Sequence, residues 1–516
     1  MKATTAAMFA ALGVLATAGH ALAAGGDLVV GIAGDLRSPI PGFTNEDSSL
    51  AIQQHIYEGL VAWKENGDVA PMLAKDLPTV SDDGKVYTFT LRDGITFHDG
   101  TPLNAAAVAG SWNFLLNPDN GWGCRQYFNG SGALKVNEVV ATGDMTVEFR
   151  LAQAAPGLLT QMARSDCGEG GIMAPAVYGG KTGPVIGTGP FKVRETRPGE
   201  RVVLERFDKY VAREEEPDGY TGRKEALLDT VTFMVIPDPA AQFSALMAGQ
   251  TDIWTQINVT YAEQIAAAPG FKVTSVPVPS INTFAIQTET GPLTNPLLRQ
   301  AISAAIDRKG MIDAVLAGRG APSGSPVPAA SPYFGEVEKA GWDYDPTRVA
   351  DLLRQAGYKG EKITVTTNRN YSVMYETGVM VQALLQAAGI NAELEVLDYA
   401  TTAQKYSRGD YQMLAWNYAP TLDPALLLDR FTGSKEQAAS KIWTNPEARE
   451  LVNKLLAAPA DERQAIYDQI HQLFLKDTPK VIWSSAYASD AFSDKVQNFS
   501  AWAGRKLRLW NVSLAK

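Results

Sequence analysis

The sequence predicts an α/β protein with more than one domain. At 516 residues the chain exceeds what one hydrophobic core usually organises, so two or three domains are expected. Strand-like and helix-like segments alternate between Asn282 and Trp416, which is typical of an α/β domain. Hydrophobic residues make up 45% and charged residues 20%, as in ordinary globular proteins.

The N-terminus has the pattern of a cleaved secretory signal. Lys2 supplies a minimal positive charge, an apolar run extends from Ala6 to Ala18, and Ala21-Leu22-Ala23 fits the small-x-small cleavage rule. The run is too short for a comfortable membrane span. We therefore expect residues 1–23 to be removed and the mature chain to be exported. No cysteine lies near the cleavage site, so a lipoprotein anchor is not expected.

The overall charge argues against polyanionic partners. The formal charge is −10 and the pI is near 5.1, so the field of the protein would not attract nucleic acid or an anionic membrane. The charge does not identify a ligand, because the charge of a pocket is independent of the net charge.

Two cysteines, Cys124 and Cys167, lie in the exported part of the chain. In an oxidising compartment an even number of cysteines favours pairing. Two small buried apolar residues are the alternative. Both cysteines lie in glycine-rich sequence of loop character, where a covalent link is useful, so the disulfide is the preferred interpretation.

Several local patterns predict elements of the first half. They are a strand over 28–32, a loop over 34–48, a helix over 49–60, a turn at Asp82-Asp83-Gly84 followed by a strand, a helix capped by Asn104 and a strand over 146–151. Residues 185–211 predict a hairpin. There Gly187-Thr188-Gly189-Pro190 forms a turn, the strands begin near Phe191 and Val202, and a Pro-Gly turn joins them.

The second half predicts the following elements: a strand over 231–236, a helix over 238–249, a strand over 282–288, a helix that starts at Pro296 and is interrupted at Gly310, a helix from Asp345 to Gly357, a strand over 362–367, a helix over 374–388, and strands over 391–397 and 411–416. The tail, about 487–516, is strand-like. Its basic segment from Arg505 to Arg508 is interpreted as a solvated strand edge rather than a nucleic-acid patch.

Four segments carry a resemblance to one family. They are V-I-G-T-G-P-F-K-V through E-R-F-D-K-Y, D-G-K-V-Y-T-F-T-L-R-D-G-I-T-F-H-D-G-T-P, G-Q-T-D-I-W and N-P-L-L-R-Q-A-I-S-A-A-I-D-R. Together they closely resemble the family-5 solute-binding proteins, the dipeptide, oligopeptide and nickel-type receptors of ABC importers. In that family His98 would belong to a structural turn.

The resemblance implies a two-lobed periplasmic binding-protein fold (type II-like, cluster C) with an extra inserted subdomain. Lobe I would combine residues 24–45, 187–278 and 487–516, the insertion would be 46–186, and lobe II would be 279–486. The resemblance also implies a monomer that captures a solute between its lobes by hinge closure and delivers it to permease subunits in the inner membrane.

The sequence lacks the motifs of the common enzymes. It has no G-x-S-x-G and no H-E-x-x-H, the glycine needed for a phosphate-binding loop before Gly180-Lys181-Thr182 is Pro175, and the three mature histidines are scattered. We therefore expect no catalytic activity and no bound metal or cofactor. A secreted hydrolase with a dispersed active site is the alternative class, since spatial sites can escape sequence analysis.

The resemblance also suggests ligand contacts. The candidate residues are Arg37, Trp254, Arg369, Tyr371, Trp416, Asn417, Tyr418 and Asp423. The segment W-N-Y-A-P-T-L-D-P resembles the family's G-W-x-x-D-x-x-D-P loop, whose first acid pairs with the α-ammonium of peptides. Here that position is Pro420, so free peptides are expected to bind poorly, and a peptide without a free α-amine or a non-peptide such as a glycoside or opine is preferred. Two residues have alternatives: Asp423 as a helix cap and Arg369 as a surface residue.

Overall fold

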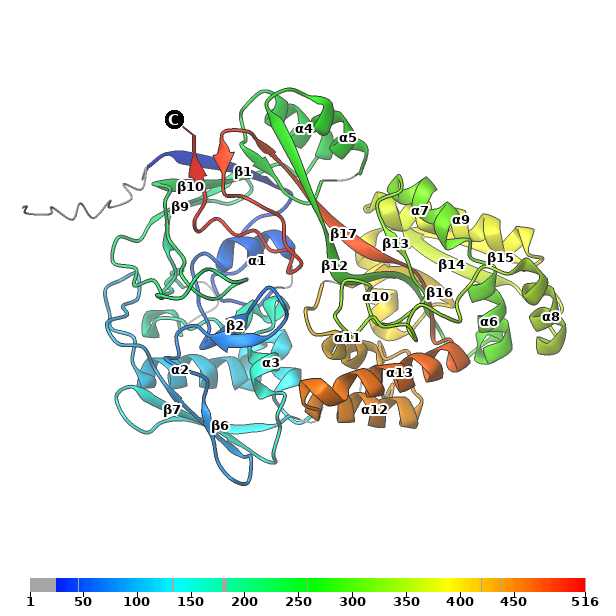
Figure 1. Cartoon of the computed structure of the whole chain (residues 1–516), viewed down its shortest axis with the longest axis horizontal. Helices are drawn as coiled ribbons and strands as arrows, with labels where there is room; N and C mark the ends of the chain where they lie inside the picture. Colours follow the sequence, from blue (N-terminus) through cyan, green and yellow to red (C-terminus); the bar gives the residue numbers. More distant parts are fainter. Residues whose placement is uncertain are drawn as a thin grey trace, which may run out of the picture.

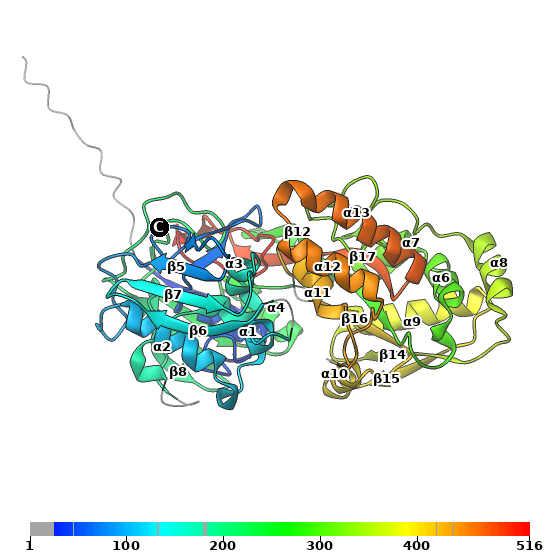
Figure 2. The same ribbon diagram turned by 90° about the horizontal axis from the view of Figure 1, so that it is seen from below.

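The chain folds into two lobes that are joined by two long strands (Figure 1). The computed structural model describes residues 25–44, 46–131, 134–178, 183–257, 259–418, 420–436 and 438–515. The expected signal segment, 1–23, lies outside the described residues. Lobe I holds the N-terminal elements and the C-terminal end, and lobe II holds the elements between the two long strands. Figure 2 shows the two lobes side by side.

The helices of lobe I are α1 (Asp47–Gln53), α2 (Ala105–Leu116), α3 (Leu158–Met162), α4 (Pro239–Met247) and α5 (Val259–Ala267). Those of lobe II are α6 (Pro296–Ala304), α7 (Arg308–Leu316), α8 (Pro346–Ala356), α9 (Ser372–Ala387), α10 (Tyr399–Arg408), α11 (Pro424–Phe431), α12 (Pro446–Ala457) and α13 (Ala460–Asp477).

A continuous sheet runs through both lobes in the order β15-β14-β16-β12-β17-β11-β1-β10-β9-β8, with β13 paired to β17. Its strands are β1 (Asp27–Ile32), β8 (Phe191–Arg197), β9 (Arg201–Arg206), β10 (Thr230–Val235), β11 (Ile253–Trp254), β12 (Phe271–Ile286), β13 (Ala321–Pro322), β14 (Ile363–Asn368), β15 (Ala392–Leu397), β16 (Met413–Asn417) and β17 (Lys480–Ser493).

Smaller sheets complete lobe I. A four-stranded sheet has the order β4-β5-β7-β6, and two pairs join β2 to β3 and β18 to β19. The strands are β2 (Val61–Trp63), β3 (Val69–Pro71), β4 (Thr79–Val80), β5 (Val86–Thr90), β6 (Val136–Ala141), β7 (Thr146–Leu151), β18 (Val496–Gln497) and β19 (Ser513–Leu514).

Strands β12 and β17 connect the lobes. They pair antiparallel from Phe271 opposite Ser493 to Ala285 opposite Lys480, with an irregularity between Pro277 and Ile281. The proposed boundaries near 278 and 487 therefore fall inside this strand pair.

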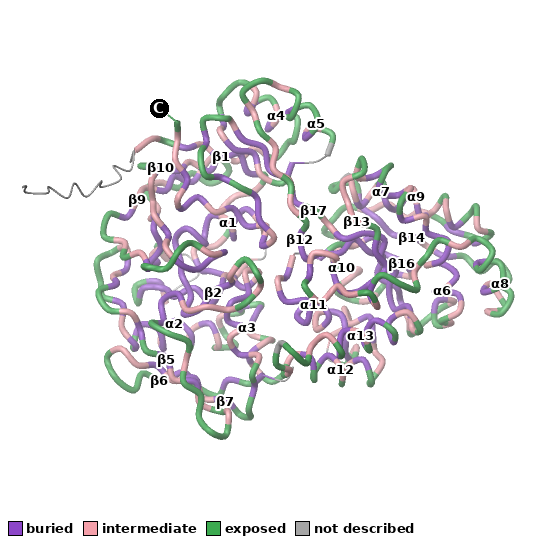
Figure 3. The backbone as a smooth tube through the Cα atoms, viewed as in Figure 1, coloured by how far each residue is buried: buried purple, intermediate pink, exposed green. Residues whose placement is uncertain are grey.

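Most buried residues fall into a cluster of one lobe or the other, but buried Leu426 of α11 in lobe II packs into the lobe I cluster (Figure 3). One hydrophobic cluster spans lobe I and includes the segment proposed as an insertion, so that Trp112 and Phe149 share a core with Val30 and Phe233. Two clusters lie in lobe II, around α6–α9 and around α11–α13. A small fourth cluster lies beneath α4 and α5.

Several local predictions are confirmed. The side chain of Asn104 accepts a hydrogen bond from Ala107 N at the start of α2. β7 has the predicted bounds, and β8 pairs with β9 as the predicted hairpin. Gly187 precedes that hairpin, and a Cβ there would lie 2.1 Å from the carbonyl oxygen of Ile56. This turn therefore needs glycine because the backbone of the α1 region passes against it.

The disulfide is also confirmed. Cys124 and Cys167 are bonded, with Cα atoms 5.7 Å apart. The bond joins two 3₁₀ turns, η2 (Gly123–Tyr127) and η3 (Ser165–Gly170), in lobe I.

Other predictions were wrong in extent. The helix expected over 49–60 is α1, which ends at Gln53. The helix expected from Pro296 to Gly310 is two helices, because Asp307 caps α7 by accepting from Gly310 N. β12 begins at Phe271 instead of 282, and β17 begins at Lys480, so most of the long interlobe pairing was missed. Beyond Ser493 the tail is mostly irregular rather than strand-like.

Among the described residues, no helix is long and apolar enough to cross a membrane.

Candidate functional site at the interlobe face

Lobe II presents a row of aromatic rings toward lobe I. Tyr406 of α10 stacks on Trp416 of β16 with ring centroids 4.3 Å apart and planes 8° apart. Tyr399 lies parallel to the same indole at 6.2 Å, and Tyr371 meets Tyr399 edge-on at 4.9 Å. We call these four residues the aromatic wall. Tyr371 is 49% exposed and Tyr399 36% exposed, so flat apolar surface is available to a ligand.

Tyr418, a predicted contact, lies behind this wall rather than on it. It is buried, and its hydroxyl is 3.0 Å from the hydroxyl of Tyr406 and accepts from Lys480 Nζ at 2.6 Å. Burial lowers the pKa of Lys480 well below its ordinary value. The Lys480–Tyr418–Tyr406 chain therefore fixes the orientation of the aromatic wall from inside lobe II.

Lobe I presents a cluster of charges. Asp47, at the start of α1, forms ion pairs with Arg505 (3.3 Å) and Lys506, and Arg505 also donates to the side chain of Gln256. We call these four residues the ion-pair wall. Burial acts to raise the pKa of Asp47, but the charges of Lys506 and Arg505 hold it below its usual range.

The ion-pair wall is held in an uncommon backbone conformation. Gln256 (φ 57°) and Arg505 (φ 64°) both lie in the left-handed region, which residues with a Cβ seldom adopt. The backbone N–H of Gln256 donates to Asp490 at 2.8 Å, and burial raises the pKa of that carboxyl to about 6. Strained residues of this kind persist where surrounding contacts fix them, and they concentrate at functional sites.

The two walls lie near each other. Burial raises the pKa of Tyr371, with further contributions from Tyr399 and from the carboxylates of Asp47 and Glu46 in lobe I. Burial likewise raises the pKa of Tyr399, with a contribution from Asp47. The fold thus brings α1 and the 505–506 segment opposite the aromatic wall.

A second interlobe contact lies beside the disulfide. Asp166, next to Cys167, accepts a forked pair of hydrogen bonds from Arg164 (3.0 and 2.8 Å) and also pairs with Arg430 of α11 in lobe II. Burial opposes ionisation, but the two guanidinium groups hold the pKa of Asp166 below its usual range. The disulfide-linked turns therefore carry a charge that joins the lobes.

Three further candidates are exposed. Arg369 follows β14, and its guanidinium lies 5.9 Å from the ring centroid of Tyr375. Asn417 ends β16, and Arg37 lies in the loop between β1 and α1, where its backbone N–H donates to Ser49 Oγ. Their side chains remain predicted ligand contacts.

Asp423 has the alternative role given in the sequence analysis. It caps α11 by accepting from Ala425 N, and its carboxylate pairs with Arg463 at 2.7 Å. It is 6% exposed, so its charge is engaged inside lobe II.

Trp254 is only 3% exposed and packs against Tyr261 in the cluster beneath α4 and α5. This burial argues against the ligand contact predicted for it, so we omit Trp254 from the contact set.

Several residues of both walls were not predicted from the sequence. Asp47 and Lys506 are 459 positions apart, so no local pattern relates them. The basic tail segment, interpreted as a solvated edge, is in fact part of the ion-pair wall. Tyr399 and Tyr406 lie seven residues apart on one helix, a spacing that indicates a shared face and could have been noticed.

The arrangement of the two walls suits ligand binding rather than catalysis. Stacked rings and ion-paired side chains can hold a small polar molecule with flat or aliphatic surfaces. Among the described residues, no group of three or more histidine, cysteine, aspartate or glutamate side chains could hold a metal ion.

Comparison with known proteins identifies the family. Residues 68–439 match the model of the bacterial extracellular solute-binding proteins, family 5, middle part. The chain belongs to this family. The glutathione-binding protein GsiB of Salmonella paratyphi A is 26% identical over 467 residues, which is 88% of each chain.

Solved structures of the same family have the same fold. The substrate-binding protein CtaP of Listeria monocytogenes is 26% identical with a TM-score of 0.81, over 96% of this chain and 100% of that one. The protein AgaA of A. tumefaciens R10 with agropinic acid is 23% identical (TM-score 0.80, over 95% and 99%). DppA of Helicobacter pylori with the peptide STSA is 24% identical (0.78, over 96% and 99%).

The family settles the class of the protein. It is a solute-binding protein of the ABC-transporter type and not an enzyme, and the hydrolase alternative is set aside because the relatives named above are binding proteins.

Proposed function

We propose that this protein captures a small organic solute between the aromatic wall and the ion-pair wall, and that the solute carries an anionic group and lacks a free peptide α-amine. A non-peptide of the opine or glycoside type, or an N-blocked peptide, meets this description. The rings of Tyr399 and Trp416 would contact flat or aliphatic surface, and Arg369 would pair with the anion.

The main support for this proposal is the lack of a free carboxylate among the described residues of the loop after β16. Pro420 offers neither a charge nor an N–H, and the carboxylate of Asp423 is already engaged by Arg463 and by Ala425 N. A peptide ammonium would therefore find no free carboxylate in this loop among the described residues. The missing charge-assisted contact would cost a free peptide about 1.5–3 kcal/mol.

Relatives differ in the ligands that their names record. They include a glutathione-binding protein, and structures with agropinic acid and with the dipeptide Met-Leu. Agropinic acid supports the opine alternative, and glutathione supports a peptide-like one. Both belong in a binding test.

We further propose that the lobes close about hinge points near residues 278 and 487, with residues 24–45, 187–278 and 487–516 forming lobe I, 46–186 its insertion and 279–486 lobe II. The monomer would lie in the periplasm after removal of residues 1–23, without a lipid anchor, and would deliver its solute to permease subunits of the inner membrane.

Calorimetric titration tests the ligand class. We expect weak binding of trialanine, no loss on N-acetylation, and tighter binding of agropinic acid, whereas glutathione, which carries a free α-amine, should bind weakly. Arg369→Gln should weaken the anionic ligand about tenfold, whereas the exposed Arg348→Gln on α8 should leave it unchanged. Tight binding of free trialanine that N-acetylation abolishes would refute the proposal.

A further inference from the structure

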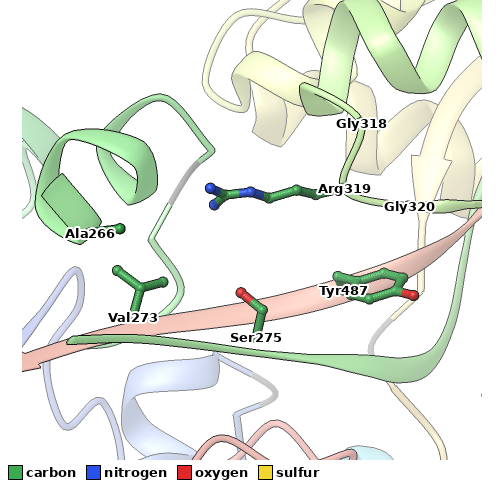
Figure 4. A pocket seen from close by; sticks show the side chains of 7 residues that line it. All are labelled: Ala266, Val273, Ser275, Gly318, Arg319, Gly320 and Tyr487. Carbon is green, nitrogen blue, oxygen red and sulfur yellow. The ribbon is translucent and has the colours of Figure 1, made fainter.

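A concave site lies beside the crossing strands, on the face away from the proposed solute site. It has a volume of about 370 Å³ and is lined by Ala266, Val273, Ser275, Gly318, Arg319, Gly320 and Tyr487 (Figure 4). We call these seven residues the hinge groove. It shares no residue with the aromatic wall or the ion-pair wall.

Strand geometry places the hinge groove away from the ion-pair wall. Alternate residues of a strand point to opposite faces. Tyr487 therefore shares a face with Ala491, which packs beneath α4 and α5. Asp490 faces the other way and accepts the N–H of Gln256, whose side chain contacts Arg505. The hinge groove and the proposed solute site thus lie on opposite sides of β12 and β17.

The hinge groove is built from both lobes. Ala266 comes from α5 of lobe I, and Arg319 comes from the turn between α7 and β13 in lobe II. Its floor consists of Val273, Ser275 and Tyr487 on the crossing strands. In Figure 4 the side chain of Arg319 extends from the lobe II turn toward α5. Any occupant that fills this space contacts both lobes.

Arg319 is an unsatisfied cation. Its Nη1 is buried and has no hydrogen-bond partner, and no ion pair or hydrogen bond of its side chain occurs among the described residues. The acid nearest to Gly318, Asp313, is already paired with Lys309 at 2.7 Å. An unpaired buried donor is unfavourable, and a guanidinium fits a carboxylate through two parallel hydrogen bonds.

The remaining lining is mostly apolar. Tyr487 is 42% exposed although it lies on a central strand, and Val273 and Ala266 add aliphatic surface. The hydroxyl of Ser275 is satisfied by Ser489 at 2.7 Å. This combination selects a molecule with one negative end and one flat apolar body.

We propose that the hinge groove binds a small carboxylate with a flat apolar body, with the carboxylate on Arg319 and the body on Tyr487. This site is separate from the solute site between the lobes. Because the occupant contacts α5 and the α7–β13 turn together, its binding favours the relative position of the lobes seen here. Binding in the hinge groove would then change the affinity of the solute site for its solute. By thermodynamic reciprocity, the solute would change the affinity of the hinge groove for the carboxylate by the same factor.

Ligand-observed NMR with benzoate as the probe tests the site. Benzoate should give saturation transfer and a dissociation constant that Arg319→Gln raises at least tenfold. Benzamide keeps the ring without the charge, and acetate keeps the charge without the ring, so both should bind at least tenfold more weakly than benzoate. Arg348→Gln is the matched control. Equal binding of benzoate and benzamide, or no effect of Arg319→Gln, would overturn the proposal.

A second experiment tests the proposed effect of binding on the relative position of the lobes. Spin labels at the exposed positions Asp82 in lobe I and Lys359 in lobe II report the distance between the lobes. Saturating benzoate should narrow this distance distribution in the otherwise native protein and leave it unchanged in Arg319→Gln. An unchanged distribution at saturation in the otherwise native protein would refute the coupling. Tyr487→Ala provides a second variant, which should lower benzoate affinity without removing the charge.

Discussion

The two walls of the interlobe face are built from different chemistry. The aromatic wall of lobe II has exposed rings whose orientation is fixed by stacking and by the buried Lys480–Tyr418 chain. The ion-pair wall of lobe I has charges that already satisfy one another, since Asp47 pairs with both Arg505 and Lys506. We therefore expect the contact area for a solute to be concentrated on lobe II. Lobe I would close over it with a surface of one carboxylate and two cations.

The largest expected effect concerns the buried ion pair at the start of α11. Asp423→Ala removes a helix cap and leaves Arg463 without its carboxylate partner, at a cost of about 3–5 kcal/mol in unfolding free energy. Denaturant unfolding measures this cost. Asp398→Ala at the exposed cap of α10 is the control and should cost only about 1 kcal/mol. Similar losses in the two variants would mean that the Asp423–Arg463 pair adds nothing.

Removal of the Cys124–Cys167 disulfide should lower the stability of lobe I more than that of lobe II. The disulfide joins residues that are 43 positions apart in lobe I. Replacing both cysteines by serine should lower the unfolding free energy by about 3–4 kcal/mol in the chain-entropy model. Hydrogen exchange followed by segment should show faster opening of η2, η3 and α1, with lobe II unchanged outside α11, whose Arg430 pairs with Asp166. Uniform loosening of both lobes would contradict an effect that is centred on the disulfide-linked turns.

These expectations show what sequence could and could not supply. The Cys124–Cys167 pair, the Asn104 cap and the β8–β9 hairpin follow from local composition, so all were predicted. The start of β12 was missed because Pro277 and Pro279 argue against a strand, and the structure accommodates them with a shift in register. The ion-pair wall joins α1 to the C-terminal tail, and only the tertiary fold brings such distant residues together.

Loss of one ring should weaken solute binding without unfolding the protein. Trp416→Ala removes the centre of the aromatic wall, and we expect about tenfold weaker binding, or about 1.4 kcal/mol, for the tightest ligand of the calorimetric panel. Tyr344→Ala, at a 50% exposed tyrosine elsewhere in lobe II, should leave affinity unchanged. Equal effects of the two substitutions would argue against stacking at Trp416.

The smallest expected effect is on the acid stability of lobe I. The folded pKa of Asp47 is below its ordinary value of 3.8, so its ion pairs stabilise the fold above that pH. This contribution is lost as pH falls below about 4, when the unfolded carboxyl takes up a proton that the folded one resists. Asp47→Asn should flatten this part of the stability profile in urea unfolding. An unchanged slope below pH 4 would show that the ion pairs contribute no stability.

The central claim is that the solute lies between these two walls, and hydrogen–deuterium exchange tests its location most directly. With the tightest ligand of the calorimetric panel at saturation, protection should appear at 371–375, 399–406 and 416–417 in lobe II and at 46–49 and 505–506 in lobe I. Protection confined to the hinge groove around 273–275, 318–320 and 487, with both walls unchanged, would contradict the account.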